Sequence, residues 1–421
     1  MNKKKALLSF PTLAHIDANI RLTGSKSESN RALIIAALSK GTINVENLSD
    51  AADTVILNGI LRGLTTDPTS TATVDVGHAG TAMRFLTAYL STISGNFELT
   101  GSKRMKERPI KLLVEALWTL GASISYLEEN GYPPLQITGG FKQLSNAVQI
   151  QGDVSSQYLS ALLIIASSLE KGLSLQIIGE LTSEPYVRMT LKMLEEAGIN
   201  HSWAQHVIKI EPQAFKPATL IVEPDWSAAS YWYSIVALQA DASIALPNLR
   251  EQSLQGDSRI QQIMIPLGVS TSRTADGIQL KSIASDLANL EEVIDLKDCP
   301  DLAQTIIVCA AAKGLNLRFT GLETLKIKET NRVKALQNEL AKIGVELKEE
   351  NLIYTLNTAG LHFPDHIVIK TYDDHRMAMA FAPLSIFIKE LEIEDMNVVE
   401  KSYPDFWKDL EKAGFTVKEV Q

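Results

Sequence analysis

The feature that most constrains the fold of this chain is a short pattern that recurs along its 421 residues. In each copy an amphipathic helix ends at a glycine and a β-like run follows at once, as in the stretch from Leu117 to Ile124. Glycine just beyond a helix adopts the left-handed conformation without a steric penalty, so each copy predicts a turn from a helix into a strand. The glycines concerned are Gly63, in the weakest copy, and Gly121, Gly198, Gly268, Gly344 and Gly414.

These glycines are spaced almost regularly. From Gly63 onward the intervals are 58, 77, 70, 76 and 70 residues, so six units of roughly 70 residues account for the chain. The period is too long for a solenoid, whose repeats span about 20 to 50 residues. A unit of this length is a small α/β module that needs neighbours to bury its core, and three plus three units predict two globular halves. The alternative is an accidental spacing, because glycines that end helices are common.

Composition excludes several classes of protein. Hydrophobic residues make up 45% of the chain and charged residues 21%, which excludes a disordered, collagen-like or coiled-coil protein. The two cysteines, Cys299 and Cys309, cannot fill a structural zinc site and are typical of a reducing compartment. Apolar runs such as residues 159–166 are far shorter than the ~20 residues that span a bilayer. With no targeting signal recognised near Met1, we expect a cytoplasmic protein that does not associate with membranes.

The net charge and the positions of the basic residues indicate which kinds of partner the chain can bind. The formal net charge of -9 disfavours nucleic acid as a partner, although it leaves a local basic patch open. The basic residues gather where helices are expected to begin. The sharpest case is the segment from Gly24 to Arg31, where Ser29 or Asn30 is the expected helix cap. Free N–H groups and the helix dipole both favour an anion there, although a solvated loop before a core helix is the plainer alternative.

Other expected helix starts repeat this chemistry. In the first half they carry hydroxyls and cations, with Thr81 as the expected cap of one helix; they comprise residues 78–84, 100–109 and 154–157. In the second half carboxylates are added, at residues 298–301, 326–332, 372–376 and 401–405. Acids beside bases are what general acid–base catalysis requires. For any single carboxylate, a helix cap or a surface ion pair explains the residue equally well.

Metal, thiol and base-stacking sites are disfavoured. His201 and His206, like the pair at positions 362 and 366, have no cysteines near them in the sequence and are typical of surface or strand histidines. Cys309 lies in an apolar helix and is expected to be inert core. Trp226 and Trp232 are interpreted as core residues, not as a platform for nucleic-acid bases.

Seven motifs occur in the order in which a known family carries them: Gly24 to Ala32, Ala79 to Arg84, Arg104 to Ile110, Ser155 to Gln157, Gln255 to Asp257, Lys328 to Arg332 and Asp374 to Ala378. Through them the chain resembles the 5-enolpyruvylshikimate-3-phosphate synthase family of enolpyruvyl transferases along nearly its whole length. The resemblance implies a two-domain inside-out α/β barrel, each domain built from three βαβαββ repeats. It also implies a first half at 22–224, a second half at 1–21 plus 225–421, and an active site in the cleft between them.

The family's reaction, in the shikimate pathway, transfers the enolpyruvyl group of phosphoenolpyruvate to the 5-hydroxyl of shikimate 3-phosphate by addition and elimination. It requires an acid for the methylene carbon, a base for the hydroxyl, and cations for phosphates and carboxylates. The resemblance implies no metal and no cofactor. It implies small-molecule substrates only, and we expect a monomer.

The resemblance also assigns residues. Contacts to shikimate 3-phosphate are implied for Lys26, Ser27, Arg31, Ser155, Ser156, Gln157, Ser183 and Lys328. Contacts to phosphoenolpyruvate are implied for Gly80, Arg104, Arg332, Arg376 and Lys401, with Lys26 and Gln157 reaching both substrates. Asp301 is the expected base and Glu329 the candidate acid, with Lys26 as a rival for part of the proton transfer.

Some positions depart from the family pattern. Phe85 stands where proline is common, which puts sensitivity to the inhibitor glyphosate in doubt. Asn331 replaces a usual aspartate, Thr324 a frequent asparagine and His78 a common asparagine. The short first interval predicts that the first repeat is trimmed.

The sequence disfavours three alternative functions. The related transferase that acts on UDP-N-acetylglucosamine usually has a cysteine in its first half and Lys-Asn-Ala where this chain has Lys26-Ser27. An inactive anion-binding relative is disfavoured by the intact set of Lys26, Asp301, Glu329 and Arg376. A nucleic-acid binder is disfavoured by the net charge.

Overall fold

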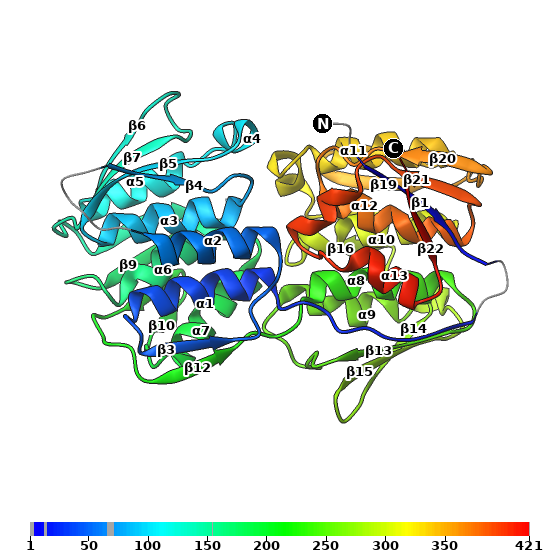
Figure 1. Cartoon of the computed structure of the whole chain (residues 1–421), viewed down its shortest axis with the longest axis horizontal. Coiled ribbons are helices and arrows are strands. Elements are labelled where there is room, and N and C mark those ends of the chain that lie inside the picture. The colour runs from blue at the N-terminus through cyan, green and yellow to red at the C-terminus, as the bar shows by residue number, and fades with distance from the viewer. Residues whose placement is uncertain (1–3, 12–14, 65–70, 154, 421) are drawn as a thin grey trace. The chain divides into compact units, whose positions relative to one another are not determined.

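The computed structural model describes residues 4–11, 15–64, 71–153 and 155–420. The chain divides into two compact units (Figure 1). One, here called the inserted unit, is Gly24–Glu223; the other, the terminal unit, is Met1–Thr23 with Pro224–Gln421. The predicted boundaries at residues 22 and 224 lie within two residues of these divisions.

Two repeats of the inserted unit have the order βαβαββ. Each forms a four-stranded sheet in which the first two strands are parallel and the closing hairpin is antiparallel to the second strand. The earlier of these two in the chain comprises β4 (Thr71–Asp75), α3 (Gly80–Thr92), β5 (Gly95–Thr100), the short α4 (Lys103–Lys106), α5 (Lys111–Leu120), β6 (Ser123–Tyr126) and β7 (Leu135–Gly139). The second comprises β8 (Ala147–Gln151), α6 (Ser156–Ala166), β9 (Leu173–Ile178), α7 (Glu184–Glu196), β10 (Ser202–Ala204) and β11 (Val207–Ile210).

The remaining repeat of this unit is shorter. It comprises α1 (Lys26–Leu38), β3 (Ile43–Glu46), α2 (Ala52–Gly63) and β12 (Ala218–Ile221). Its sheet has two parallel strands, β12 and β3, and no hairpin is present among the described residues of this repeat. The predicted turn at Gly63 is wrong, because Gly63 is the last residue of α2 and Leu64 follows it with φ -68°.

The terminal unit contains three sheets of four strands, and its helices lie between the strands in the chain order of the same repeat. The strands are β1 (Lys5–Ser9), β2 (Ile16–Asn19), β13 (Ala242–Pro247), β14 (Val269–Arg273), β15 (Gly277–Ser282), β16 (Val293–Asp295), β17 (Arg318–Thr320), β18 (Glu346–Glu350), β19 (Ile353–Asn357), β20 (His366–Ile369), β21 (Glu390–Ile393) and β22 (Thr416–Val420). The helices are α8 (Trp226–Leu238), α9 (Ile260–Met264), α10 (Ala303–Ala312), α11 (Arg332–Leu340), α12 (His375–Phe381) and α13 (Phe406–Lys412).

The N-terminal strands complete two of these sheets. β1 pairs with both β21 and β22, and β2 pairs in parallel with β13, more than 220 residues away in the sequence. Both strands therefore belong to the terminal unit, although the inserted unit follows them in the chain.

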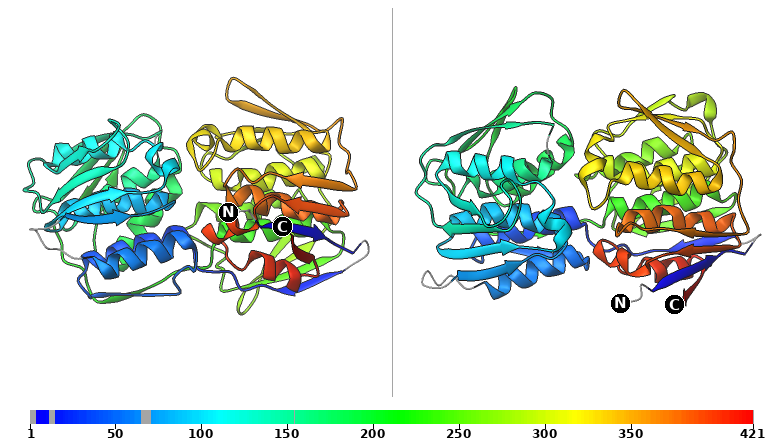
Figure 2. Two further views of the ribbon diagram at one scale, coloured as in Figure 1. Left: turned by 45° about the horizontal axis from the view of Figure 1, so that its top comes forward. Right: turned by 90° about the horizontal axis from the view of Figure 1, so that it is seen from above.

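Within each unit the helices lie inside and the sheets outside (Figures 1 and 2). The reason is in the sequence: α6 and α10 are apolar on every side, and every residue of α10 is buried. Strands such as β8 alternate exposed and buried positions, so one face packs on the helices and the other meets solvent.

The helix-ending glycines behave as predicted in five of the six cases. Gly121, Gly198, Gly268, Gly344 and Gly414 all have φ between +73° and +111°. At Gly344 a Cβ atom would also lie 2.0 Å from the Gly360 carbonyl oxygen, so no other residue fits there without a shift.

Two predicted helix caps are wrong. The cap of α1 is Ser25, whose hydroxyl accepts a hydrogen bond from the Glu28 amide, so Ser29 and Asn30 lie inside the helix and are buried. The residue before α3 is Ala79, which leaves Thr81 within the first turn. In both cases the helix begins earlier than the polar residues suggested. Their side chains bond to other segments instead of capping: the Ser49 amide donates to the Ser29 hydroxyl, and Gln157 Nε2 donates to the Thr81 hydroxyl.

Candidate active site

A buried arginine organises the polar centre of the terminal unit. Arg332 opens α11 directly after Asn331, whose side chain caps the helix by accepting from the Lys334 amide at 3.0 Å. Its guanidinium is bound by three carboxylates: Nε to Asp374 at 2.7 Å, Nη1 to Asp301 at 3.0 Å and Nη2 to Glu329 at 3.0 Å. Burial disfavours the charged guanidinium, but these carboxylates outweigh burial and raise the pKa of Arg332.

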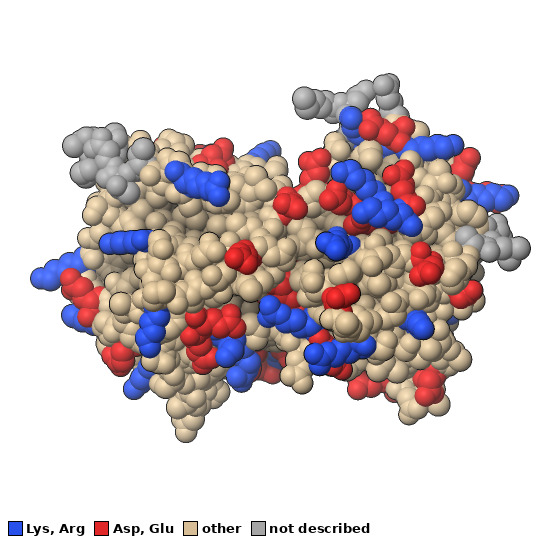
Figure 3. All heavy atoms as spheres, turned by 60° about the horizontal axis from the view of Figure 1, so that its bottom comes forward, with Lys and Arg blue, Asp and Glu red and all other residues tan. Residues whose placement is uncertain are grey.

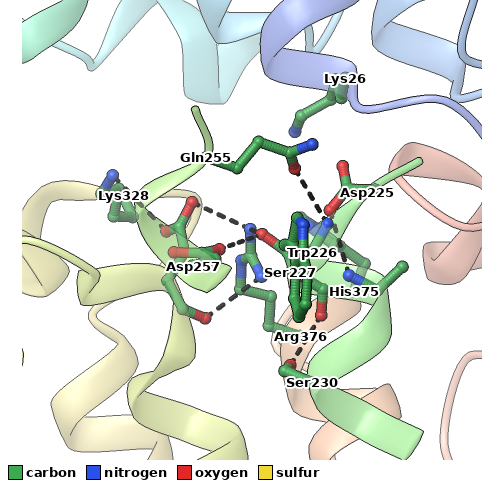
Figure 4. A network of polar contacts seen from close by, with 12 residues as sticks. Lys26, Asp225, Trp226, Ser227, Ser230, Gln255, Asp257, Lys328, His375 and Arg376 are labelled. Atoms are coloured by element: carbon green, nitrogen blue, oxygen red, sulfur yellow. Dashed lines mark hydrogen bonds and ion pairs between the residues drawn. The ribbon is translucent and has the colours of Figure 1, made fainter. Parts of the chain in front are cut away.

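A second arginine shares one of these carboxylates. Arg376 lies in the first turn of α12, where its amide donates to Asp374 Oδ1 at 2.9 Å. Its Nη2 contacts Asp301 Oδ2 at 2.9 Å and also donates to the Ser227 hydroxyl at 3.3 Å, at the start of α8 (Figure 4). The Asp301 carboxylate therefore lies between two guanidinium groups, and the Lys328 ammonium is 3.8 Å from its other oxygen.

Glu329 is held in the same way from two sides. Its Oε1 accepts from the Lys401 ammonium at 3.0 Å, while its Oε2 contacts Arg332. Both Lys401 and Glu329 are 13% exposed, so this pair is partly open to a ligand. All six residues predicted for this half belong to one network: Asp301, Lys328, Glu329, Arg332, Arg376 and Lys401.

Asp257 is a part of this centre that the sequence analysis did not assign. It lies in a short 3-10 helix, Gly256–Arg259, and accepts a hydrogen bond from the Ser227 hydroxyl (Figure 4). Burial, and then the nearby Asp301 carboxylate, raises the pKa of Asp257 to about 7. The motif from Gln255 to Asp257 is the sequence signal that could have identified Asp257, whereas no local pattern marks Ser227.

Gln255, in the same motif, bonds to the backbone at the start of α8. Its Oε1 accepts from the Trp226 amide at 2.9 Å and its Nε2 donates to the Pro224 carbonyl at 2.8 Å. These two bonds hold the start of α8, the helix that carries Ser227 and Tyr231. The Tyr231 hydroxyl in turn meets Arg376 Nη1 at 3.5 Å.

In the inserted unit, Lys26 and Arg31 lie on α1 but in different surroundings. Lys26 is the first residue of the helix and its ammonium is 3.4 Å from Asp53 Oδ2. Arg31 is buried against the rings of Phe85 and Tyr186. Four of its N–H groups donate within the unit, to the Ser27 and Tyr186 carbonyls and to the hydroxyls of Thr190 and Ser160. Burial lowers the pKa of Arg31 to about 10.

The start of α3 is backed by Arg108 and not by Arg104. A Cβ atom at Gly80 would lie 2.4 Å from Arg108 Nη1, so the guanidinium lies directly against this glycine. Arg108 is 8% exposed, and its Nε has no hydrogen-bond partner among the described residues. Arg104 lies on the short α4 with 43% of its side chain exposed, and it pairs with Glu107. Both arginines occupy one motif, and sequence spacing did not distinguish them.

The other predicted residues of this unit lie at two further helix starts. Ser155 caps α6 by accepting from the Gln157 amide, Ser156 is the first helical residue, and Gln157 Nε2 donates to the Thr81 hydroxyl at 3.1 Å. Gln157 thus links the first turns of α6 and α3. Ser183 precedes α7 with φ +56°, a conformation uncommon outside glycine.

The prediction that Trp226, Trp232 and Cys309 are core residues is confirmed. Trp226 and Trp232 are completely buried, and so is Cys309, where burial raises the pKa of the thiol to about 11. His362 contacts the Gly360 carbonyl. In the part of the chain that the structure describes, no group of three or more histidines, cysteines or carboxylates is arranged to hold a metal ion, and no helix could span a bilayer. Figure 3 shows basic and acidic side chains interspersed on the face that it presents.

Cations and carboxylates at the starts of helices are the groups that an enzyme acting on small anions requires, and here an inside-out α/β fold carries them. Comparison with known protein families shows which family the chain belongs to. A family model described as EPSP synthase (3-phosphoshikimate 1-carboxyvinyltransferase) matches residues 12–410, and the chain belongs to this family.

Individual relatives agree. The chain is 46% identical over 415 residues to the 3-phosphoshikimate 1-carboxyvinyltransferase of Bacteroides fragilis strain YCH46, covering 98% of each protein. It is 35% identical to the protein of the same name from Histophilus somni strain 2336, covering 97% of this chain and 99% of that protein. A solved structure of EPSP synthase from Acinetobacter baumannii superposes with a TM-score of 0.77 at 20% identity, over 99% of this chain and 100% of that one. The predicted family and fold class are thereby confirmed.

Proposed function

We propose that this chain transfers the enolpyruvyl group of phosphoenolpyruvate to the 5-hydroxyl of shikimate 3-phosphate and releases inorganic phosphate, in aromatic amino-acid biosynthesis. The observation that carries the proposal is the Asp301 carboxylate between the guanidinium groups of Arg332 and Arg376. Together with the family relation, this network supports a site where an anionic substrate and a proton acceptor meet.

The reaction has two steps. In the addition, the methylene carbon of phosphoenolpyruvate takes up a proton, and the 5-hydroxyl oxygen bonds to the adjacent carbon as it loses its own proton. In the elimination, the new methyl group gives up a proton and the carbon–oxygen bond to phosphate breaks. An acid, a base and fixed positive charges lower the barrier of each step.

In this proposal the terminal unit supplies the proton-transfer groups. Asp301 accepts the hydroxyl proton, with Lys328 beside it to bind shikimate 3-phosphate. An anionic group of phosphoenolpyruvate would replace Asp301 as a partner of Arg376 and leave the carboxylate ready for the proton. Glu329, positioned by Lys401 and Arg332, is the proposed acid at the methylene carbon.

The inserted unit would hold both substrates through its helix starts. Lys26, Ser27, Arg31, Ser155, Ser156, Gln157 and Ser183 are the proposed contacts to shikimate 3-phosphate. Gly80 contributes its amide to phosphoenolpyruvate, and we assign the accompanying arginine to Arg108, because Arg108 lies against Gly80 while Arg104 is turned to solvent. The proposal further includes action as a monomer in the cytoplasm, without a metal or cofactor.

The experiment is an assay of phosphate release from both substrates. Release is expected with the wild-type chain, whereas Lys26→Ala and Asp301→Ala should abolish turnover while circular dichroism shows an intact fold. Lys389→Ala, which changes an exposed lysine in the terminal unit, serves as a matched control with unchanged rate. Absence of release from the wild-type protein, or preference for UDP-N-acetylglucosamine in a competition assay, would refute the proposal.

A further inference from the structure

The segment that enters α12 has an unusual backbone. Tyr372 and Asp373 are consecutive and both left-handed, with φ of 54° and 55°. Neither is glycine, so each pays a steric penalty that the surrounding structure must offset. Asp374, which binds Arg332, comes next, and Arg376, which contacts Asp301, lies two residues further on. The strained turn therefore lies immediately before two members of the polar centre.

A buried carboxylate at the far end of α11 holds this turn. The Tyr372 hydroxyl donates to Glu339 Oε1 at 2.8 Å, and the Lys370 amide donates to Glu339 Oε2 at 3.0 Å. The Glu339 side chain is 1% exposed and is also paired with Lys342. Two of its three partners therefore belong to the segment around the turn, and the third, Lys342, lies in the 3-10 turn that directly follows α11.

The two ends of α11 thus hold the same segment. Arg332, at the first residue, binds Asp374, and Glu339, seven residues later, binds Lys370 and Tyr372. Seven residues of α-helix span about 10 Å. The helix acts as a rigid spacer that sets where the turn begins and where it ends.

We propose that Tyr372 and Glu339 are positioning residues, which hold the left-handed turn so that Asp374 and Arg376 present the phosphoenolpyruvate-binding guanidinium groups in a fixed geometry. The inference rests on the proposed function, since Arg332 and Arg376 are assigned there to phosphoenolpyruvate. Loss of the clamp lets the turn relax and displaces both arginines. Shikimate 3-phosphate, assigned to Lys328 and the inserted unit, should be affected less.

The test compares Tyr372→Phe and Glu339→Gln with the control Tyr233→Phe. Tyr233 is a buried tyrosine of the terminal unit, whereas Tyr372 is partly buried, and the Tyr233 hydroxyl bonds to Thr271 on β14. We expect Tyr372→Phe to raise KM for phosphoenolpyruvate roughly tenfold, as for loss of a bond to a charged group, with KM for shikimate 3-phosphate within about twofold of wild type. Because both variants break one clamp, the double variant should be no worse than the more severe single one.

Amide hydrogen exchange gives a second readout that does not depend on activity. The amides of Asp374 and Arg376 donate within this turn, to the Thr371 carbonyl and Asp374 Oδ1, so Tyr372→Phe should speed their exchange about tenfold. A KM for phosphoenolpyruvate like that of the control, with unchanged exchange, would overturn the positioning role. Failure of the wild-type chain to release phosphate would instead refute the proposed function, and the exchange measurement would still test the clamp.

Discussion

Removal of the Asp374 carboxylate is the sharpest test of the electrostatic centre. Asp374 is fully buried and Arg332 is 2% exposed, and they meet at 2.7 Å. Asp374→Ala deletes this contact and also the cap that accepts from the Arg376 amide. The guanidinium remains buried, with Asp301 and Glu329 as its other carboxylate partners.

The magnitude follows from these contacts. Breaking a buried ion pair costs about 3 to 5 kcal/mol because a charge is left without its partner. Two of the three carboxylates around Arg332 persist, which favours the lower end, and the lost cap adds about 1 kcal/mol. We therefore expect Asp374→Ala to lower the free energy of unfolding by about 3 to 4 kcal/mol. Asp374→Asn, which retains an oxygen for the cap, should lower it by about half as much.

The free energy of unfolding is to be measured by urea denaturation, followed by tryptophan fluorescence. Trp226 and Trp232 are buried in the terminal unit and report its unfolding. Asp365→Ala is the control, since Asp365 and Lys389 form an ion pair that is more than 80% exposed at Asp365 and contributes less than about 1 kcal/mol. If Asp374→Ala costs no more than Asp365→Ala, the argument that buried charge balance stabilises this site is wrong.

Three further outcomes are expected. Gln304 is fully buried, and neither end of its amide has a hydrogen-bond partner among the described residues. Gln304→Met should therefore raise the free energy of unfolding, measured by urea denaturation, by about 1 kcal/mol. A loss of stability would contradict this. The raised pKa of Asp257, about 7, means that the folded state retains a proton that the unfolded chain releases near pH 4. Stability should therefore fall as pH rises from about 4 to 7, by at most about 1.4 kcal/mol per pH unit, and Asp257→Asn should flatten this dependence; a parallel pH profile would refute it. Finally, Arg108→Lys should lower kcat/KM for phosphoenolpyruvate by at least about 100-fold, as expected when a fixed guanidinium fork is lost. Arg104→Lys should change kcat/KM less than about threefold. A larger effect of Arg104→Lys than of Arg108→Lys would return the phosphoenolpyruvate contact to Arg104.

Local signals predicted much of the architecture. The repeat was visible from the glycines that end helices, and five of them have the positive φ that this interpretation requires. Such a signal is local because the left-handed conformation depends on one residue and its neighbours. Helices α6 and α10, apolar on every side, were visible as runs in the sequence, and such helices must be buried. The caps at Ser29 and Thr81 were mispredicted, since a polar residue is compatible with a helix interior when a partner from another segment bonds to it. Gly63 was mispredicted because a glycine can also be the last residue of a helix without a left-handed turn.

The sequence by itself thus determined the repeat, the buried helices and the helix starts that carry charge. Only the tertiary structure decided which of those groups meet: Arg108 and not Arg104 at Gly80, Asp257 with Ser227, and Tyr372 with Glu339. Pairings between segments 28 or more residues apart are set by how helices pack and where sheets hold them, and no periodicity in a single segment encodes that register. The types of the reactive groups are therefore visible in short sequence motifs, whereas the distances between those groups depend on how distant parts of the chain pack.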